Sequence, residues 1–105
     1  MPDAILIAVA NGAGKTTFAR QFLQVQYPGG AFLNADEIRR EDPRFAHPVA
    51  AGRELLRRLA ELETASATFA VETTLSSSRY ARRLRAWSQG GYRTTLHFIE
   101  QPSAD

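Results

Sequence analysis

The feature that most constrains this chain is a glycine-rich run around Gly14-Lys15-Thr16, which lies between an apolar run at 4–9 and a helix-like segment at 18–23. This order predicts a strand, a phosphate-binding loop and a helix. Glycines let the backbone curl so that successive N–H groups point inward, and the positive end of the helix dipole adds to the attraction for a polyphosphate. The residues that we expect to bind the phosphates of a nucleotide are Asn11, Gly12, Ala13, Gly14, Lys15, Thr16 and Thr17.

Two side chains of this run have separate expected roles. The Lys15 ammonium group is expected to reach the β- and γ-phosphates and to act in catalysis, and the Thr16 hydroxyl is expected to ligate Mg²⁺. Lys15 is the only lysine in the chain, since every other basic residue is an arginine. The two residue types are not interchangeable there, because a compact ammonium group must fit beside the phosphates.

One position departs from the full phosphate-loop pattern, which has glycine five positions before Gly14. This chain has Val9 there. Because a β-branched residue adopts only negative φ comfortably, we expect Val9 to reshape the start of the loop without abolishing phosphate binding. The alternative interpretation is an ordinary glycine-rich turn between a strand and a helix, with a surface lysine.

Length and composition are those of an ordinary folded protein. We expect 105 residues to form one domain over residues 1–105. Cysteine is absent, which excludes disulfides, a thiol nucleophile and cysteine-ligated metals. No apolar run approaches the roughly 20 residues of a membrane span, and no signal peptide precedes the first expected strand. We therefore expect a cytoplasmic protein without a membrane partner.

The apolar pattern predicts further strands and helices after the loop. In chain order these are strands at 31–35, 68–72 and 92–99, and a helix at 49–64. A further helix follows the N-cap candidates Ser76, Ser77 and Ser78 and ends at Gly90-Gly91. The stretch 41–48 carries two prolines and mixed charge, and we expect it to be a loop with His47 exposed. Strands that alternate with helices predict an α/β fold, with a parallel sheet of about four strands and helices on both faces.

Helical spacing also predicts which side chains of the two later helices are buried. The expected apolar residues are Leu55, Leu56, Leu59 and Leu62 in the first, and Tyr80, Leu84 and Trp87 in the second. On the solvent side of the first helix, Glu54 is four residues before Arg58, and Arg57 is four residues before Glu61. That spacing suits ion pairs along a helix.

Polar residues follow the strands where a ligand is expected. In open parallel sheets ligands bind beyond the carboxyl ends of the strands; Asp36 follows the second strand, and Glu72 and Thr74 end the third. A carboxylate there could accept the proton of an attacking hydroxyl group, as phosphoryl transfer requires. Structural alternatives remain open. Asn34 and Glu37 fit a capping box, in which Asp36 only begins a helix. Glu72 could pair with an arginine, and Thr74 could continue the strand.

Several arginines lie close together near the end of the chain, at positions 79, 82, 83 and 85. A basic helix face can follow the phosphates of a nucleic acid. Aromatic residues for base stacking are not interleaved with these arginines, so we expect a solvated helix face and no nucleic-acid partner. One or two of the arginines could instead face an anionic substrate.

Some longer segments add a family resemblance to this interpretation. They are ANGAGKTTFAR at 10–20, FLNADEIR at 32–39, AGRELL at 51–56, FAVETTLS at 69–76 and GYRTTLHFI at 91–99. Together they resemble the bacterial zeta-toxin family of P-loop kinases, and the resemblance runs through nearly all of the chain. The second and fourth segments, in this order behind the loop, are more specific than the loop alone.

The resemblance implies a P-loop kinase fold and phosphorylation of a sugar hydroxyl with ATP or GTP as co-substrate. UDP-N-acetylglucosamine is the substrate associated with the toxin members. By position, Lys15 and Thr16 match the nucleotide and Mg²⁺ sites, and Asp36 matches the catalytic base. Glu72 and Thr74 match positions that hold the sugar. A toxic role is not implied, because members outside toxin–antitoxin pairs share these motifs.

The resemblance also implies that this domain is truncated at its C-terminal end. The family continues beyond the fourth strand into a lid whose arginines clamp the transferring phosphate, and loss of such an arginine typically lowers the rate by roughly 10³ to 10⁵. The alternative function is therefore a non-catalytic remnant that binds a nucleotide or a partner protein. Such a partner would be an antitoxin-like protein or, at a bare sheet edge, a second copy of the chain.

Overall fold

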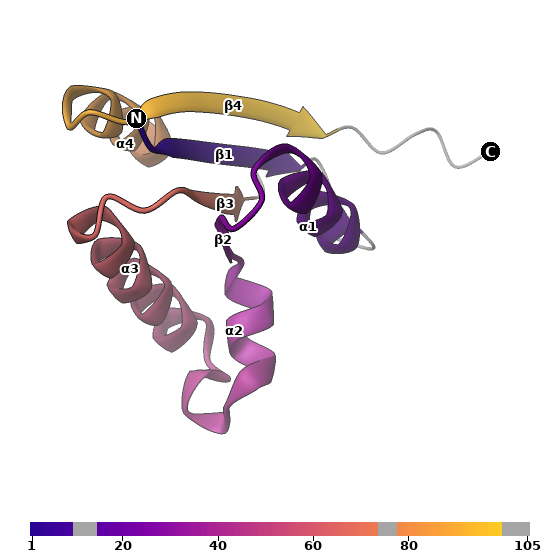
Figure 1. Ribbon diagram of the computed structural model, residues 1–105. Coiled ribbons are helices and arrows are strands. Elements are labelled where there is room, and N and C mark those ends of the chain that lie inside the picture. Colours follow the sequence, from indigo (N-terminus) through magenta and orange to yellow (C-terminus); the bar gives the residue numbers. More distant parts are fainter. Residues whose placement is uncertain (10–14, 74–77, 100–105) are drawn as a thin grey trace.

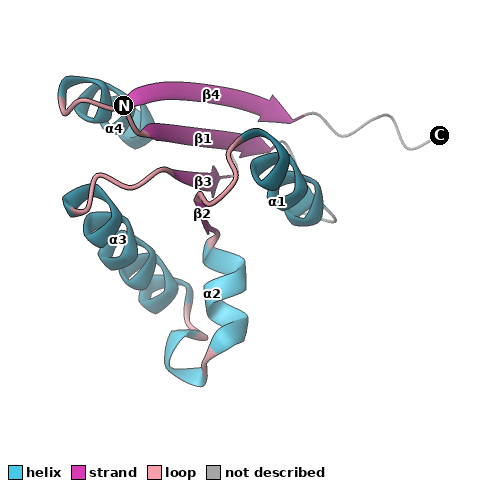
Figure 2. Ribbon diagram, in the orientation of Figure 1, coloured by secondary structure: helices cyan, strands magenta, loops and turns pink. Residues whose placement is uncertain are grey.

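The computed structural model describes residues 1–9, 15–73 and 78–99 of the chain (Figure 1). Helices and strands alternate along these segments (Figure 2). The strands are β1 (Asp3–Val9), β2 (Ala31–Leu33), β3 (Phe69–Thr73) and β4 (Arg93–Ile99). The helices are α1 (Lys15–Gln26), α2 (Ala35–Glu41), α3 (Pro48–Thr64) and α4 (Ser78–Gln89), with a short 3-10 helix, η1 (Pro43–Phe45), between α2 and α3.

The four strands form one sheet in the order β2-β3-β1-β4. Every pair of neighbours is parallel, and the register places Val71 of β3 beside both Leu6 of β1 and Leu33 of β2. The predicted α/β fold with a four-stranded parallel sheet is therefore confirmed. Because all strands run the same way, their carboxyl ends meet at a single edge of the sheet.

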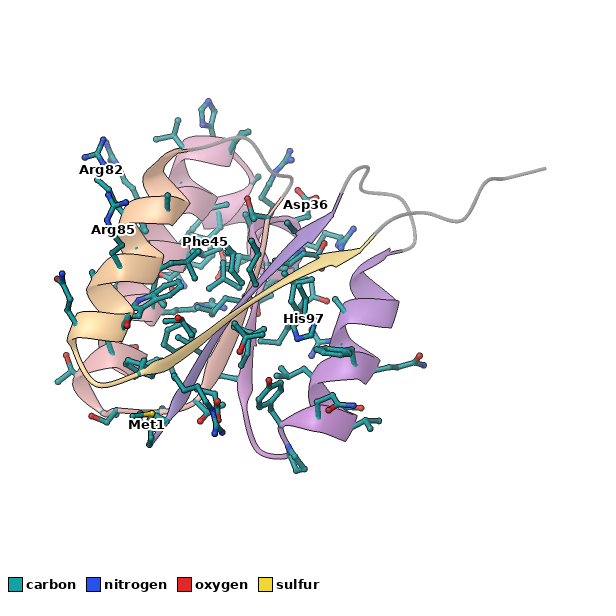
Figure 3. All side chains as sticks on the ribbon, turned by 90° about the horizontal axis from the view of Figure 1, so that it is seen from above. Met1, Asp36, Phe45, Arg82, Arg85 and His97 are labelled. Atoms are coloured by element: carbon teal, nitrogen blue, oxygen red, sulfur yellow. The ribbon has the colours of Figure 1, made fainter. Side chains whose placement is uncertain are left out.

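Alternate residues of the strands pack against helices on opposite faces of the sheet. Ile5 and Ile7 of β1 are buried together with Ala19 and Leu23 of α1. Residues between them, such as Leu6, belong to a second core cluster built with α2, α3 and α4. Figure 3, seen from above, shows α1 on one side of the strands and α4 on the other. Helices on both faces, as predicted, bury the sheet on both sides.

Helix α3 has most of the expected apolar face, with one exception. Leu55 and Leu59 are buried and Leu62 packs against the same cluster, whereas Leu56 is 47% exposed. The prediction for Leu56 was wrong because it is only one residue after Leu55, which turns its side chain about a quarter of the way round the helix. Ala51 of the first turn is buried instead. Both predicted ion pairs form, Glu54–Arg58 at 2.8 Å and Arg57–Glu61 at 3.0 Å.

The prediction of a loop over 41–48 was only partly right, because most of these residues belong to helical turns. Its prolines, Pro43 and Pro48, stand at the first positions of η1 and α3, where a missing N–H and a fixed φ are favourable. Asp42 begins η1 by accepting a hydrogen bond from the N–H of Arg44 at 2.8 Å. His47 is exposed, as predicted, and its Nδ1 accepts the N–H of Val49 at 3.1 Å, which caps α3.

The end of α4 also agrees with the sequence pattern. Trp87 is buried against Phe69, with their ring centroids 5.1 Å apart, and Leu84 packs on the same cluster. Gly91 follows the helix with φ of +97°, a conformation that favours glycine. The side chain of Tyr80 and the serines at 76 and 77 lie outside the residues described. Among the described residues, no helix is long and apolar enough to cross a membrane.

Candidate functional site

The expected phosphate loop joins the central strand of the sheet to α1. Strand β1 ends at Val9 and α1 begins at Lys15. The first turn of this twelve-residue helix therefore starts at the carboxyl edge of the sheet, and helix N-termini carry partial positive charge. Lys15, Thr16 and Thr17 are its first three residues. The other expected phosphate-binding residues, Asn11, Gly12, Ala13 and Gly14, lie outside the residues described.

At the end of β2, Asn34 and not Asp36 caps the following helix. The Asn34 side-chain oxygen accepts a hydrogen bond from the N–H of Glu37 at 2.9 Å, and Asn34 is itself buried. The expected strand 31–35 is therefore two residues too long, because Ala35 already begins α2. The Asp36 carboxylate is 67% exposed and lies 3.8 Å from Arg39 Nη1. Because Asn34 supplies the cap, the Asp36 carboxylate remains accessible from solvent.

A pocket of about 470 Å³ opens beside Asp36. Its lining residues are Asp36, Arg39, Arg40 and Ala46. The first three are at helical spacing on one face of α2, opposite the buried Ile38. Arg39 Nε donates a hydrogen bond to the Ala46 carbonyl at 3.0 Å. The volume falls within the usual range for small-molecule sites, and two arginines line the pocket together with the carboxylate.

Glu72 lies near the carboxyl end of β3. It is opposite Ile7 of β1 in the sheet register and is 8% exposed. Because residues alternate across a strand, Glu72 is on the same face as Ala70, the face covered by α1. Thr74 and the three residues after it lie outside the residues described.

The strand order brings the separate predictions together. The phosphate loop follows β1, Glu72 is in β3 and Asp36 follows β2, and these are three neighbouring strands. The sequence alone predicts that each residue lies near a strand end. It does not predict that β3 stands between β1 and β2, which places Glu72 between the loop and the Asp36 helix.

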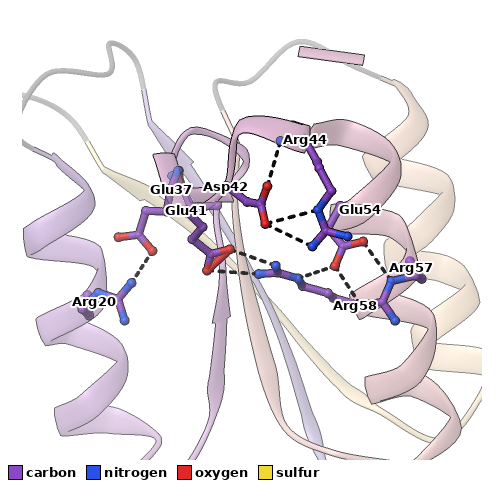
Figure 4. Close-up of polar contacts among 9 residues, drawn as sticks. Arg20, Glu37, Glu41, Asp42, Arg44, Glu54, Arg57 and Arg58 are labelled. Atoms are coloured by element: carbon purple, nitrogen blue, oxygen red, sulfur yellow. Dashed lines mark hydrogen bonds and ion pairs between the residues drawn. The ribbon is translucent and has the colours of Figure 1, made fainter. Parts of the chain in front are cut away.

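An ion-pair network that joins α2 to α3 was only partly expected from the sequence. Arg58 contacts Glu54 on its own helix and Glu41 at the end of α2, each at 2.8 Å (Figure 4). Hydrogen bonds from Arg57 and then Arg58 lower the pKa of Glu54 from 4.5 to about 2. The Arg58–Glu41 pair has no local sequence signal, because the partners are on different helices. It helps to fix the far end of α2 against α3.

Mg²⁺ is the metal that the sequence predicts at this site. Within residues 1–9, 15–73 and 78–99 there is no group of three or more histidine, aspartate or glutamate side chains that could hold a metal ion. Mg²⁺ in nucleotide sites typically takes one or two protein ligands together with phosphate oxygens and water. Thr16, the expected Mg²⁺ ligand, is the second residue of α1.

Three arginines of α4 have described side chains, Arg82, Arg83 and Arg85. Arg83 Nη1 is 3.7 Å from Glu63 Oε2 on α3. Arg82 and Arg85 are exposed and extend outward from α4 (Figure 3). This arrangement matches the expected solvated helix face.

Comparison with known proteins supports the family resemblance and the fold. A protein family described as Zeta toxin matches residues 1–104. A solved structure from work on the PezAT chromosomal toxin–antitoxin system of Streptococcus pneumoniae matches with a TM-score of 0.78 and 21% sequence identity. The match covers 94% of this chain and 46% of that one, so this chain spans about half the length of the solved protein. None of the curated protein sequences matches significantly.

Proposed function

Because the chain belongs to the zeta toxin family, we propose that it is a P-loop kinase that phosphorylates a hydroxyl group of a small substrate. ATP or GTP is the phosphate donor, and a nucleotide sugar such as UDP-N-acetylglucosamine is the acceptor. The observation that supports this proposal is that β1, β3 and β2 are neighbouring parallel strands, so that the start of α1, Glu72 and the start of α2 lie at the carboxyl edge of the sheet. We propose that this kinase acts in the cytoplasm, where its co-substrate ATP is present.

The donor nucleotide binds at the start of α1. The backbone N–H groups of residues 11–17 hold the phosphates, and Lys15 neutralises the charge that develops on the β- and γ-phosphates. The Thr16 hydroxyl would hold Mg²⁺, and this ion would supply positive charge that offsets the negative charge of the phosphates. Together these groups position the γ-phosphate beyond the carboxyl end of β1.

Asp36 is the general base of the proposed reaction. Its carboxylate accepts the proton of the acceptor hydroxyl, whose oxygen then bonds to the γ-phosphorus while the bond to the β-phosphate oxygen breaks. The products are a phosphorylated acceptor and the nucleoside diphosphate. An exposed carboxylate beside an open pocket can be reached by such a hydroxyl.

Glu72 and Thr74 hold the acceptor sugar in this proposal. A carboxylate accepts hydrogen bonds from sugar hydroxyl groups, and a threonine hydroxyl can accept or donate them. Glu72 is buried on the face of the sheet that α1 covers. A buried position suits a contact that keeps water away from the reacting groups.

A second candidate function follows from the length of the match, since this chain spans 46% of the solved zeta toxin chain. In this alternative the chain binds a nucleotide or a protein without catalysis. The partner would be an antitoxin-like protein, or a second copy pairing along β4, which is an edge strand of the described sheet.

A phosphate-transfer assay separates the two candidates. Wild type, Lys15→Ala and Asp36→Asn are incubated with γ-labelled ATP, Mg²⁺ and UDP-N-acetylglucosamine, and labelled acceptor is separated by chromatography. The kinase proposal predicts label in the acceptor with wild type and its loss in both variants. ATP binding without transfer to this or other sugar nucleotides would contradict the kinase proposal and favour the non-catalytic one.

A further inference from the structure

Arg20 connects the helix after the phosphate loop to two other elements. It is in the second turn of α1, and its guanidinium carbon lies 4.9 Å from the ring centroid of Phe32 on β2. Its Nη2 donates a hydrogen bond to Glu37 Oε1 in the first turn of α2 (Figure 4). The aromatic face and the carboxylate hold the planar guanidinium from two directions.

Two further interactions fix the first turn of α2, one just before Glu37 in the sequence and one just after it. The N–H of Glu37 donates to Asn34, which fixes the backbone at the end of β2. Ile38, the next residue, is buried in the cluster that α2 shares with α3. Asp36 precedes Glu37 directly, so its backbone belongs to the same helical turn that the Arg20–Glu37 contact ties to α1.

From this geometry we propose that Arg20 is a positioning residue that couples the nucleotide-binding end of α1 to Asp36. This inference rests on the proposed function, since the coupling matters only if the loop before α1 binds a nucleotide. Phosphate binding orders the first turn of α1, and Arg20, one turn further along, transmits that order to Glu37. The phosphate donor and the proposed base, Asp36, are then held in a fixed position relative to each other.

Residue-resolved amide hydrogen exchange with and without Mg-ATP tests the coupling. In the wild-type chain, Mg-ATP is expected to slow exchange both in α1 and at residues 36–38. Arg20→Ala should keep the effect in α1 and lose that at 36–38. We expect the lost protection to be about two- to fivefold, the range that an exposed ion pair typically supports.

Matched variants separate positioning from general stability. Glu37→Gln keeps the side-chain size and should lose the same response as Arg20→Ala. Arg57→Ala removes an arginine of similar exposure whose partners are both on α3, and should keep the response at residues 36–38. Arg20→Lys keeps the charge and should retain part of the protection at residues 36–38 that Arg20→Ala loses.

Each outcome decides the proposal. Protection at 36–38 that disappears in Arg20→Ala and Glu37→Gln but persists in Arg57→Ala supports the coupling. Protection of α1 without any change at 36–38 in the wild-type chain overturns the coupling and leaves the proposed function standing. Persistence of the response in Arg20→Ala also overturns it. No effect of Mg-ATP anywhere in the wild-type chain removes the proposed function, and this inference with it.

Discussion

The Asn34 side-chain oxygen lies 2.9 Å from the N–H of Glu37 and accepts its hydrogen bond, so Asn34 is the residue that caps α2. This relationship separates the two interpretations of Asp36. A residue that is not the cap can be changed with little effect on folding. The cap of α2 is therefore assigned to Asn34, and the proposed catalytic role of Asp36 can be tested separately from it.

Asp36→Asn is expected to change the free energy of unfolding by no more than about 0.5 kcal/mol, because the carboxylate is 67% exposed and its nearest ion-pair atom is 3.8 Å away. Phosphate transfer should fall by roughly 10² to 10⁴, the usual contribution of a general base. Urea unfolding and the labelled-ATP assay measure the two quantities. A variant that loses stability and keeps transfer would remove Asp36 from the catalytic role.

Asn34→Ala is the complementary change. Loss of the cap should lower the free energy of unfolding by about 1 kcal/mol. Asn34→Asp keeps an oxygen acceptor and should retain most of the stability, which makes it the matched control. Equal stability of Asn34→Ala and wild type in urea would show that α2 does not depend on this cap.

The Glu54 network predicts a specific dependence of stability on pH. Arg57 and Arg58 lower the pKa of Glu54 from 4.5 to about 2 in the folded chain. A lowered carboxyl pKa stabilises the fold at pH values above the unfolded value, and this stabilisation is lost as the pH falls from about 4.5 towards 2. The difference in unfolding free energy between wild type and Glu54→Gln should therefore shrink over this interval. A difference that stays constant with pH would contradict the prediction.

Two leucines of α3 provide a matched test of the core. Leu59 is 1% exposed and Leu56 is 47% exposed. Leu59→Ala should lower the free energy of unfolding by about 2 to 5 kcal/mol, whereas Leu56→Ala should change it by less than about 1 kcal/mol. Denaturant titrations of the two variants give both values directly. Similar losses in the two variants would mean that α3 packs in a different rotation.

The elements with strong periodic patterns could be predicted from the sequence. Strand β1 has a continuous buried apolar run, and helix α3 has apolar residues at helical spacing. These two elements and strand β4 lie within one or two residues of the bounds that the sequence predicts. Helix α2 was not predicted as a helix in its own right. It has seven residues, five of them charged, and its single buried side chain is Ile38. A helix this short is stabilised mainly by tertiary contacts, which a local pattern does not contain.

The residues of the candidate site remain a prediction from the sequence, and their arrangement could not be predicted from it. The position of Asp36 after one strand and of Glu72 in another is visible in the sequence, but their neighbourhood follows from the strand order β2-β3-β1-β4. The contact of Arg20 with Glu37 joins residues 17 positions apart on different helices. Contacts of this kind depend on the packed fold, so residue spacing along one helix cannot reveal them.

The central claim, that the loop before α1 binds a nucleotide, is tested most directly by isothermal titration calorimetry of the chain with Mg-ATP beside Lys15→Ala. The account predicts saturable binding to wild type and an affinity at least about tenfold weaker for Lys15→Ala, since the ammonium group interacts directly with the phosphates. Both proteins should unfold at similar urea concentrations. Equal Mg-ATP affinity in the two proteins, or no binding to wild type, would contradict the account.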